Sequence, residues 1–206
     1  MTKKDILTKI FRIIIILSAI IGIVLNASNS VEPSKQFIYF TLQSNVLVAI
    51  VYIILIFLKK ESRIFNLVKN QATVAIILTG LVFNLLLRPV VDGYDYNPNT
   101  ISDFLVHSLT SFLVLIDFIF FTNHGKIKKI DPVYWLIFPF IYWIFTIIYV
   151  AFGGNFNGET YESNYPYFLL NFKEYGIVFF LLVVIFVLII SYMLFYIDKL
   201  MFKRRK

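Results

Sequence analysis

The sequence contains no cysteine and only two histidines, His107 and His124. The absence of cysteine excludes disulfide bonds, thiol nucleophiles and iron–sulfur ligation. The two histidines fall at opposite ends of one apolar run, so they do not form the Cys/His ligand set typical of a zinc site. We therefore expect neither a metal nor another cofactor.

We also expect no soluble appendage and no low-complexity linker, and the sequence shows no convincing internal repeat. Without a repeat, the inverted-repeat architecture of many transporters is not indicated. The net charge is +7, but no basic patch is interleaved with aromatic residues in the way typical of a nucleic-acid partner. We expect one domain over residues 1–206.

Long apolar runs dominate what is present, and 59% of the residues are hydrophobic. Each run is close to the ~20 residues that an α-helix needs to cross a ~30 Å hydrocarbon core. The pattern predicts an all-α polytopic membrane protein with six transmembrane helices. The runs are Ile10–Ala27, Phe37–Leu58, Ala72–Leu87, Ile101–Thr122, Val133–Phe152 and Tyr175–Ile197.

The basic residues predict an orientation. Of the 19 Lys and Arg residues, 16 lie in the two termini and in the loops after the second and fourth runs. The positive-inside rule then places both termini in the cytoplasm, and the basic residues meet anionic lipid headgroups there. The exceptions are Lys35, Arg88 and Lys173.

The first run permits a second interpretation. Its basic start, the apolar stretch Ile13–Leu25 and the small residues near Ala27 are also typical of a signal peptide. Removal of that peptide would leave five spans and an external N-terminus just before the second.

Polar residues within the runs are the candidates for function, because a polar side chain in hydrocarbon is costly and needs a partner. In the second run Thr41, Ser44 and Asn45 share one helix face. In the fourth run Asp103 and His107 share a face, which continues to Thr110 and Ser111.

Depth connects the two runs. Thr41 lies about 6 Å and His107 about 9 Å from the outer start of its run, so both fall in the outer third of the bilayer. Asn84 and Arg88 reach a similar depth at the outer end of the third run. We therefore predict a polar cluster that lines an outward-facing cavity. Its members are Thr41, Ser44, Asn45, Asn84, Arg88, Asp103 and His107.

Such a cluster suits ester hydrolysis. A threonine hydroxyl becomes a nucleophile when a neutral imidazole removes its proton, as His107 could do for Thr41. Asp103 could orient the ring, and the amides of Asn45 or Asn84 could stabilise an oxyanion. At this depth an acyl chain enters from the lipid and water enters from outside, which favours a lipid ester as substrate.

A non-enzymatic interpretation uses the same residues. Ser and Thr in membrane helices often bond to a backbone carbonyl or join helices, so the cluster could bind ligand in a carrier or hold an assembly together. A carrier should show a polar path that continues to the cytoplasmic side. The sequence indicates little such polarity there apart from Asp117, which favours the hydrolase.

Three further features are interpreted as structural or peripheral. Asp117 lies about 15 Å deeper than His107 and is expected to bond to a Tyr or Thr of a neighbouring span. His124 is expected to be a solvated turn residue. The loop Gly153–Glu174 is expected at the membrane interface, as part of an aromatic belt or folded over the cavity as a lid.

Arg88 precedes Pro89, so a helix is expected to stop there. Arg88 is a candidate partner for Asp92, Asp103 or a substrate carboxylate, with snorkelling to the membrane surface as the alternative.

The sequence contains the segments Phe40-Thr-Leu-Gln-Ser-Asn-Val-Leu47 and Asp103-Phe-Leu-Val-His-Ser108. Together with other segments they resemble small bacterial six-span membrane proteins, which are distant relatives of the androgen-induced-protein family. The similarity covers nearly the whole chain and is strongest at these two segments. Eukaryotic members of that family are intramembrane threonine hydrolases of fatty acid esters. The resemblance implies Thr41 as nucleophile, His107 as general base, a bacterial plasma membrane as location, and membrane lipids as partners.

Overall fold

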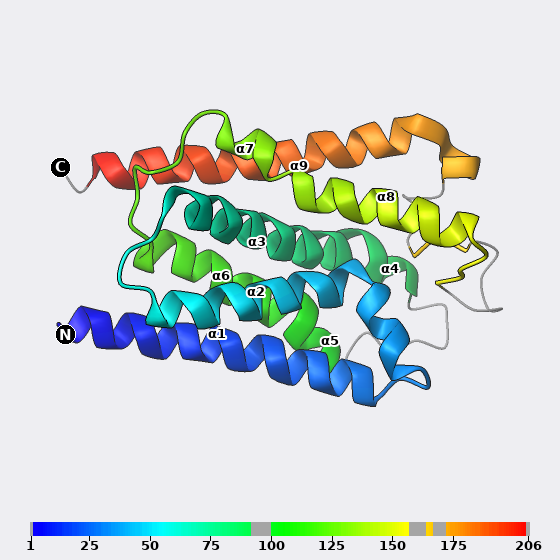
Figure 1. Cartoon of the computed structure of the whole chain (residues 1–206), viewed down its shortest axis with the longest axis horizontal. Coiled ribbons are helices and arrows are strands. Elements are labelled where there is room, and N and C mark those ends of the chain that lie inside the picture. The colour runs from blue at the N-terminus through cyan, green and yellow to red at the C-terminus, as the bar shows by residue number, and fades with distance from the viewer. Residues whose placement is uncertain (1, 92–99, 157–163, 167–171, 205–206) are drawn as a thin grey trace.

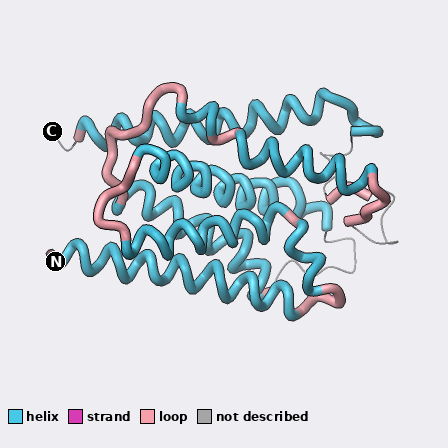
Figure 2. The backbone as a smooth tube through the Cα atoms, in the orientation of Figure 1, coloured by secondary structure: helices cyan, strands magenta, loops and turns pink. Residues whose placement is uncertain are grey.

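The computed structural model describes residues 2–91, 100–156, 164–166 and 172–204, and every element within them is helical. Figure 2 shows helices joined by loops throughout this part of the chain. The described residues contain six helical segments long and apolar enough to cross a membrane, as predicted. The protein is an all-α polytopic membrane protein. The spans are Lys3–Ser28, Phe40–Phe57, Arg63–Leu87, Ile101–Phe121, Asp131–Ala151 and Phe180–Lys203.

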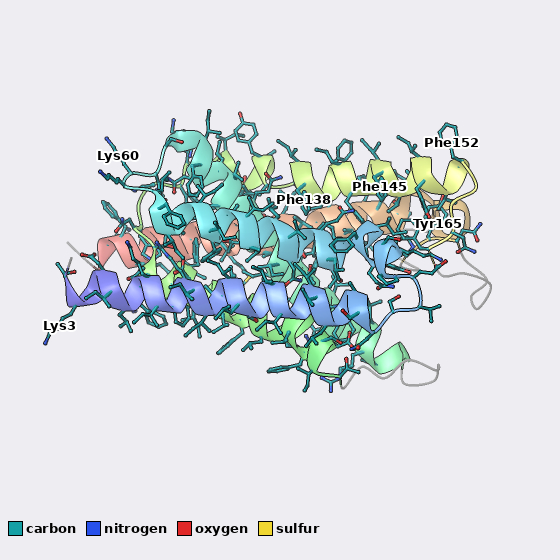
Figure 3. The ribbon with its side chains drawn as sticks, turned by 60° about the horizontal axis from the view of Figure 1, so that its bottom comes forward. Lys3, Lys60, Phe138, Phe145, Phe152 and Tyr165 are labelled. Carbon is teal, nitrogen blue, oxygen red and sulfur yellow. The ribbon has the colours of Figure 1, made fainter. Side chains whose placement is uncertain are left out.

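Both chain ends lie at the same end of the bundle, which we call the terminal end (Figure 1). Figure 3 places Lys3 and Lys60 at the terminal end, and Phe152 and Tyr165 at the opposite end. The six spans alternate in direction, and because their number is even, the chain ends on the side where it began.

The first helix, α1 (Lys3–Ser28), begins with a capping box in which the Thr2 hydroxyl accepts from the backbone N–H of Asp5. It lies beside α2 (Phe40–Phe57), which follows the short 3₁₀ helix η1 (Pro33–Ile38). Gly22 allows α1 to approach the fourth span closely, because a Cβ atom there would lie 2.8 Å from the Val106 side chain.

Helix α3 (Arg63–Val82) lies in the middle of the bundle (Figure 1). It begins at Arg63, capped by the Ser62 hydroxyl, and not at Ala72 as the apolar run predicted. Its first turns include the buried polar residues Asn66, Lys69 and Asn70. Polar side chains that face neighbouring helices do not lengthen an apolar run, so hydropathy placed this boundary too late.

The third span continues through a π-helical segment, η2 (Phe83–Leu87), into α4 (Arg88–Val91). The prediction that the helix stops before Pro89 is wrong. The Arg88 N–H bonds to the Phe83 carbonyl, five residues back. A wider π turn relieves the contact between a proline ring and the preceding turn, which explains why the helix passes through Pro89.

The fourth span alternates between two helical geometries. It runs as α5 (Ile101–Asp103), π-helical η3 (Phe104–Leu109), α6 (Thr110–Ile116) and π-helical η4 (Asp117–Phe121). Thr100 caps its start, since its hydroxyl accepts from the backbone N–H of Asp103. Single π turns inside α-helices occur often at functional sites, and His107 lies within η3.

The last two spans form one edge of the bundle (Figure 1). The short α7 (Asp131–Tyr134) leads into α8 (Ile137–Ala151), and α9 (Phe172–Lys203) completes the described chain. Helices α8 and α9 meet through stacked rings, with the Trp143 and Phe180 centroids 4.0 Å apart.

Candidate functional site

Thr41 and His107 meet between the second and fourth spans. The Thr41 hydroxyl oxygen lies 3.2 Å from Nε2 of His107, and both side chains are buried. Thr41 is in the first turn of α2, and η3 presents His107. The two residues that the sequence places at a similar depth are therefore in contact.

The hydrogen bonds of the ring define its tautomer. Nδ1 of His107 lies 3.2 Å from the backbone carbonyl of Asp103, which can only accept. The proton is therefore assigned to Nδ1, and Nε2 is left to accept from the Thr41 hydroxyl. This is the arrangement that a general base requires.

The Asp103 carboxylate lies close to the same ring, beyond hydrogen-bond distance. One of its oxygens lies 3.6 Å from Nδ1 of His107, and the other accepts from the Thr100 hydroxyl. Asp103 is 3% exposed, so its charge acts on the imidazole with little screening by solvent.

Two packing contacts that the sequence does not predict fix the position of His107. The Phe83 ring stacks on His107 with centroids 3.6 Å apart and planes 8° apart. Gly80 lets α3 approach η3, because a Cβ atom there would lie 2.8 Å from the His107 carbonyl oxygen and 2.7 Å from Oγ of Ser111. No spacing rule pairs residues across helices, so the sequence offers no signal for either contact.

Thr41 lies on the wall of a cavity of about 440 Å³ between α2, α3, α8 and α9. Thr79 supplies a second hydroxyl, and the rest of the lining is aromatic or aliphatic, with Tyr142 and Trp143 among the aromatic residues. Ile137 and Phe140, which line the cavity, are about half exposed on the membrane-facing side of α8. The cavity therefore reaches the lipid-facing surface.

A second, more polar pocket of about 310 Å³ lies beyond Phe83, at the opposite end of the bundle from the termini. Phe83 also lines the first cavity, so its ring forms a shared wall between the two spaces. The pocket lining is Phe83, Arg88, Thr100, Ile101, Asp103, Phe104 and Ser108.

The predicted amide donors already form hydrogen bonds to other groups of the protein. The Asn45 amide donates to the carbonyls of Thr41 (2.8 Å) and Val106 (2.9 Å). The Asn84 amide donates to the Gly80 carbonyl and to the Ser108 hydroxyl. An amide group has two N–H donors, so neither residue retains one for an oxyanion, and that expectation is wrong.

Ser44 also has a structural environment. Its hydroxyl lies 2.8 Å from that of Thr79 and 2.9 Å from the Thr41 carbonyl, and the residue is fully buried. Like Asn45, it joins neighbouring spans and holds the backbone on which the Thr41 side chain is mounted.

The start of α2 offers other donors. The backbone N–H groups of Phe40, Thr41 and Leu42 have no acceptor within the helix, and no side chain caps this end. These groups carry the positive end of the helix dipole next to the Thr41 hydroxyl.

A charged network occupies the terminal half of the bundle. Nε of Arg12 lies 3.1 Å from one oxygen of Asp117, and the Tyr52 hydroxyl donates to the other at 3.2 Å. Nearby, buried Lys69 pairs with Glu61 at 2.7 Å. The expected bond between Asp117 and a tyrosine is confirmed, whereas the expectation that this half holds little polarity beyond Asp117 is wrong.

His124 is not a solvated turn residue, which corrects a second expectation. It is 7% exposed, with Nδ1 3.3 Å from the Asp198 carboxylate and Nε2 3.0 Å from the Ile119 carbonyl. The turn folds back onto α9, where Asp198 also accepts from the backbone N–H of Gly125.

Only part of the predicted lid can be placed. Phe156 is buried, and its carbonyl accepts from the Tyr39 hydroxyl at the start of α2. Its N–H donates to the Asn164 carbonyl at 3.1 Å. Residues 157–163 and 167–171 lie outside the described residues, as does Asp92, the predicted partner of Arg88.

Comparison of the chain with protein-family models, curated proteins and solved structures finds no match. Within the part of the chain that the structure describes, no three His, Cys, Asp or Glu side chains converge as metal ligands would. The candidate site of the described residues is therefore the contact between Thr41 and His107 beside the cavity.

Proposed function

We propose that this protein is an intramembrane hydrolase of lipid esters, with Thr41 as nucleophile and His107 as general base. One observation carries the proposal: the Thr41 hydroxyl lies 3.2 Å from Nε2 of His107 and also borders an apolar cavity. A nucleophile must contact its base and its substrate at once, and this hydroxyl is placed for both.

The first chemical step is acylation of Thr41. Its oxygen attacks the ester carbonyl while Nε2 of His107 takes the hydroxyl proton. The carbonyl oxygen becomes an oxyanion beside the free N–H groups of the first turn of α2, which stabilise it. The ester C–O bond then breaks, and the imidazolium returns the proton to the leaving alkoxide.

The second step is deacylation by water. His107 removes a proton from the water as it attacks the acyl-threonine, and then returns it to the Thr41 oxygen as the acid leaves. During both steps the imidazolium is stabilised by the Asp103 carboxylate, 3.6 Å from Nδ1.

The cavity supports a lipid as substrate. An acyl chain in the bilayer has direct access through the lipid-facing side of α8, and burial of its methylene groups favours binding. The resemblance to six-span threonine hydrolases supports the same roles for Thr41 and His107. With it we propose a location in a bacterial plasma membrane, with both termini cytoplasmic and the site near the outer leaflet.

A second candidate function is a non-enzymatic lipid or solute carrier, or an assembly partner. The charged network of Arg12, Tyr52 and Asp117 favours it, because that network continues the polarity of the fourth span towards the terminal end. Ser18 and Thr110, whose hydroxyls lie 2.8 Å apart, add a polar contact between the two regions.

Labelling with a fluorophosphonate, which reacts covalently with activated hydroxyl groups, separates the two functions. Purified wild-type protein should be labelled, and peptide mapping should place the label on Thr41. Thr41→Ala and His107→Ala should lose labelling and lower hydrolysis of a fluorogenic fatty acyl ester by about 10³-fold or more.

Thr73→Ala is the matched control, since Thr73 is a buried threonine of α3 whose hydroxyl donates to the Lys69 carbonyl of the same helix. It should be labelled like the wild type. The loss of one hydrogen bond in Thr41→Ala should lower stability by only about 0.6 kcal/mol. Folded wild-type protein that takes no label and hydrolyses no ester would refute the hydrolase and leave the carrier.

A further inference from the structure

We infer that the cavity beside Thr41 selects its substrate by acyl-chain length, and that Leu78 and Val187 form the floor that stops the chain. The inference rests on the proposed hydrolase and narrows its substrate class to esters of a medium-length acyl chain, of about six to eight carbons. The chain runs from Thr41 towards the terminal end of the bundle, and the alcohol part of the ester lies towards the opposite end.

The lining of the cavity changes along its length. The hydroxyls of Thr41 and Thr79 lie on its wall, on α2 and α3. Towards the terminal end the wall includes Leu78, Leu136 and Val187, which are all aliphatic. The ester group carries hydrogen-bond acceptors and suits the level of the hydroxyls, whereas a hydrocarbon chain suits the aliphatic end.

The floor belongs to the packed core of the bundle. Leu78 is 6% exposed and Val187 is fully buried, and both are members of one cluster of buried apolar side chains. That cluster continues towards the terminal end through Val74 and Leu194. Carbons that extended beyond the floor would need space that packed side chains already fill, and overpacking of this kind costs free energy. The floor therefore limits the length of the chain.

The height of Thr41 above the floor follows from its neighbours. Thr41 contacts His107, and the Phe83 ring stacks on His107, so Thr41 lies near the level of Phe83. Leu78 precedes Phe83 by five residues of α3, which is a rise of about 7.5 Å. An extended chain advances about 1.2 Å per bond, so about six bonds fit between the ester and the floor.

The other end of the cavity has a softer wall. The Phe180 ring centroid lies 4.0 Å from that of Trp143 and 6.3 Å from that of Phe140, and all three residues line the cavity. Phe140 is 46% exposed to the lipid-facing side, so its ring can turn outward without disturbing the core. The packed floor has no such freedom, and we therefore assign the selectivity to the acyl side of the ester.

Binding of methyl ketones tests the floor without turnover, because a ketone has a carbonyl group and no ester bond. The probes are methyl ketones with alkyl chains of increasing length, added to the protein in zwitterionic nanodiscs. Affinity per mole fraction of ketone in the bilayer is read from the rise in the thermal unfolding midpoint. It should stay level up to about six to eight carbons and then fall about tenfold within about two further carbons, because the added methylenes overpack the floor.

Two variants of the floor should move this limit in opposite directions. Leu78→Ala should lengthen the longest chain that binds well by about three carbons, as many as the side chain loses, and Val187→Phe should shorten it. Ile189→Phe is the matched control, since Ile189 also lies on α9 but is 52% exposed, and it should leave the limit unchanged. Leu78→Ala decides the question if Val187→Phe does not fold.

Two results would overturn the inference. Level affinity along the whole series would mean that the chain leaves sideways into lipid, past the half-exposed Ile137, and meets no floor. Equal limits in Leu78→Ala and Ile189→Phe would mean that another part of the cavity stops the chain.

These results are separable from those of the proposed function. A chain-length limit that moves with Leu78→Ala, in a protein that hydrolyses no ester, would keep the floor and remove the hydrolase. Hydrolysis of esters with no such limit would keep the hydrolase and remove the floor.

Discussion

The two histidines of this chain, each beside an aspartate, occupy opposite kinds of environment. Both ring nitrogens of His124 face fixed acceptors, the Asp198 carboxylate and the Ile119 carbonyl, in a packed turn. His107 has one nitrogen on a backbone carbonyl and the other on the Thr41 hydroxyl, which borders a cavity. The two buried histidines therefore differ in what the second ring nitrogen contacts: a fixed acceptor in His124, and a hydroxyl beside a cavity in His107.

The same contrast holds between the two halves of the bundle. The terminal half pairs opposite charges directly, as Arg12 with Asp117 and Lys69 with Glu61, among closely packed side chains. The opposite half holds the hydroxyl–imidazole contact of Thr41 and His107, with the Asp103 carboxylate close by, beside two open spaces. We interpret the first region as a clamp for the helices and the second as the region reserved for a ligand.

Removal of Asp117 should break the clamp and has the largest expected effect on stability. Asp117→Ala leaves Arg12 without its carboxylate in a buried site, which costs about 3–5 kcal/mol. Thermal unfolding in detergent should show a large fall in midpoint, while Thr41→Ala in parallel stays near the wild type. If both variants unfold alike, the proposed division of roles is wrong.

Variants of the two histidines test whether His124 contributes to stability and His107 to labelling. His124→Gln should lower the free energy of unfolding by about 1–3 kcal/mol, through lost bonds to a buried carboxylate, and should leave the folded protein's labelling intact. His107→Gln should instead lose the labelling, and its loss of the Phe83 stacking should lower the free energy of unfolding by about 0.5–1.5 kcal/mol. Unfolding curves and fluorophosphonate labelling of both variants test these two expectations.

Phe83→Leu should have the smallest effect. The substitution keeps an apolar side chain but removes the stacking on His107, which is worth about 0.5–1.5 kcal/mol. We expect ester hydrolysis to fall by at most about tenfold, without loss of labelling. A fall as large as that of His107→Ala would show that Phe83 contributes more than the position of the ring.

The sequence predicted the spans well because apolar run length is a local property. It misplaced the start of α3 because Asn66, Lys69 and Asn70 are polar yet face other helices. It paired Thr41 with His107 because depth along a span can be counted in residues. Phe83, Thr79 and the partners of Asp117 and His124 depend on which helices are neighbours, and that arrangement cannot be counted along a single chain.

The roles of Asn45 and Asn84 were missed for a related reason. Their amides suit an oxyanion in principle, but backbone carbonyls and a serine already take their protons. A donor is available to a substrate only if the fold leaves it unused, and the sequence does not record which donors are used.

The π turns of the fourth span set its rotational phase. An α-helix advances about 100° per residue, and a π turn holds one residue more, so η3 rotates all that follows relative to an unbroken α-helix. The same span thus presents His107 to Thr41 and, further along, Asp117 to Arg12 and Tyr52. Deletion of one residue within η3 would restore the α-helical phase and turn either His107 or Asp117 away from its partners. Both sets of contacts therefore form on one span only because of an irregular turn.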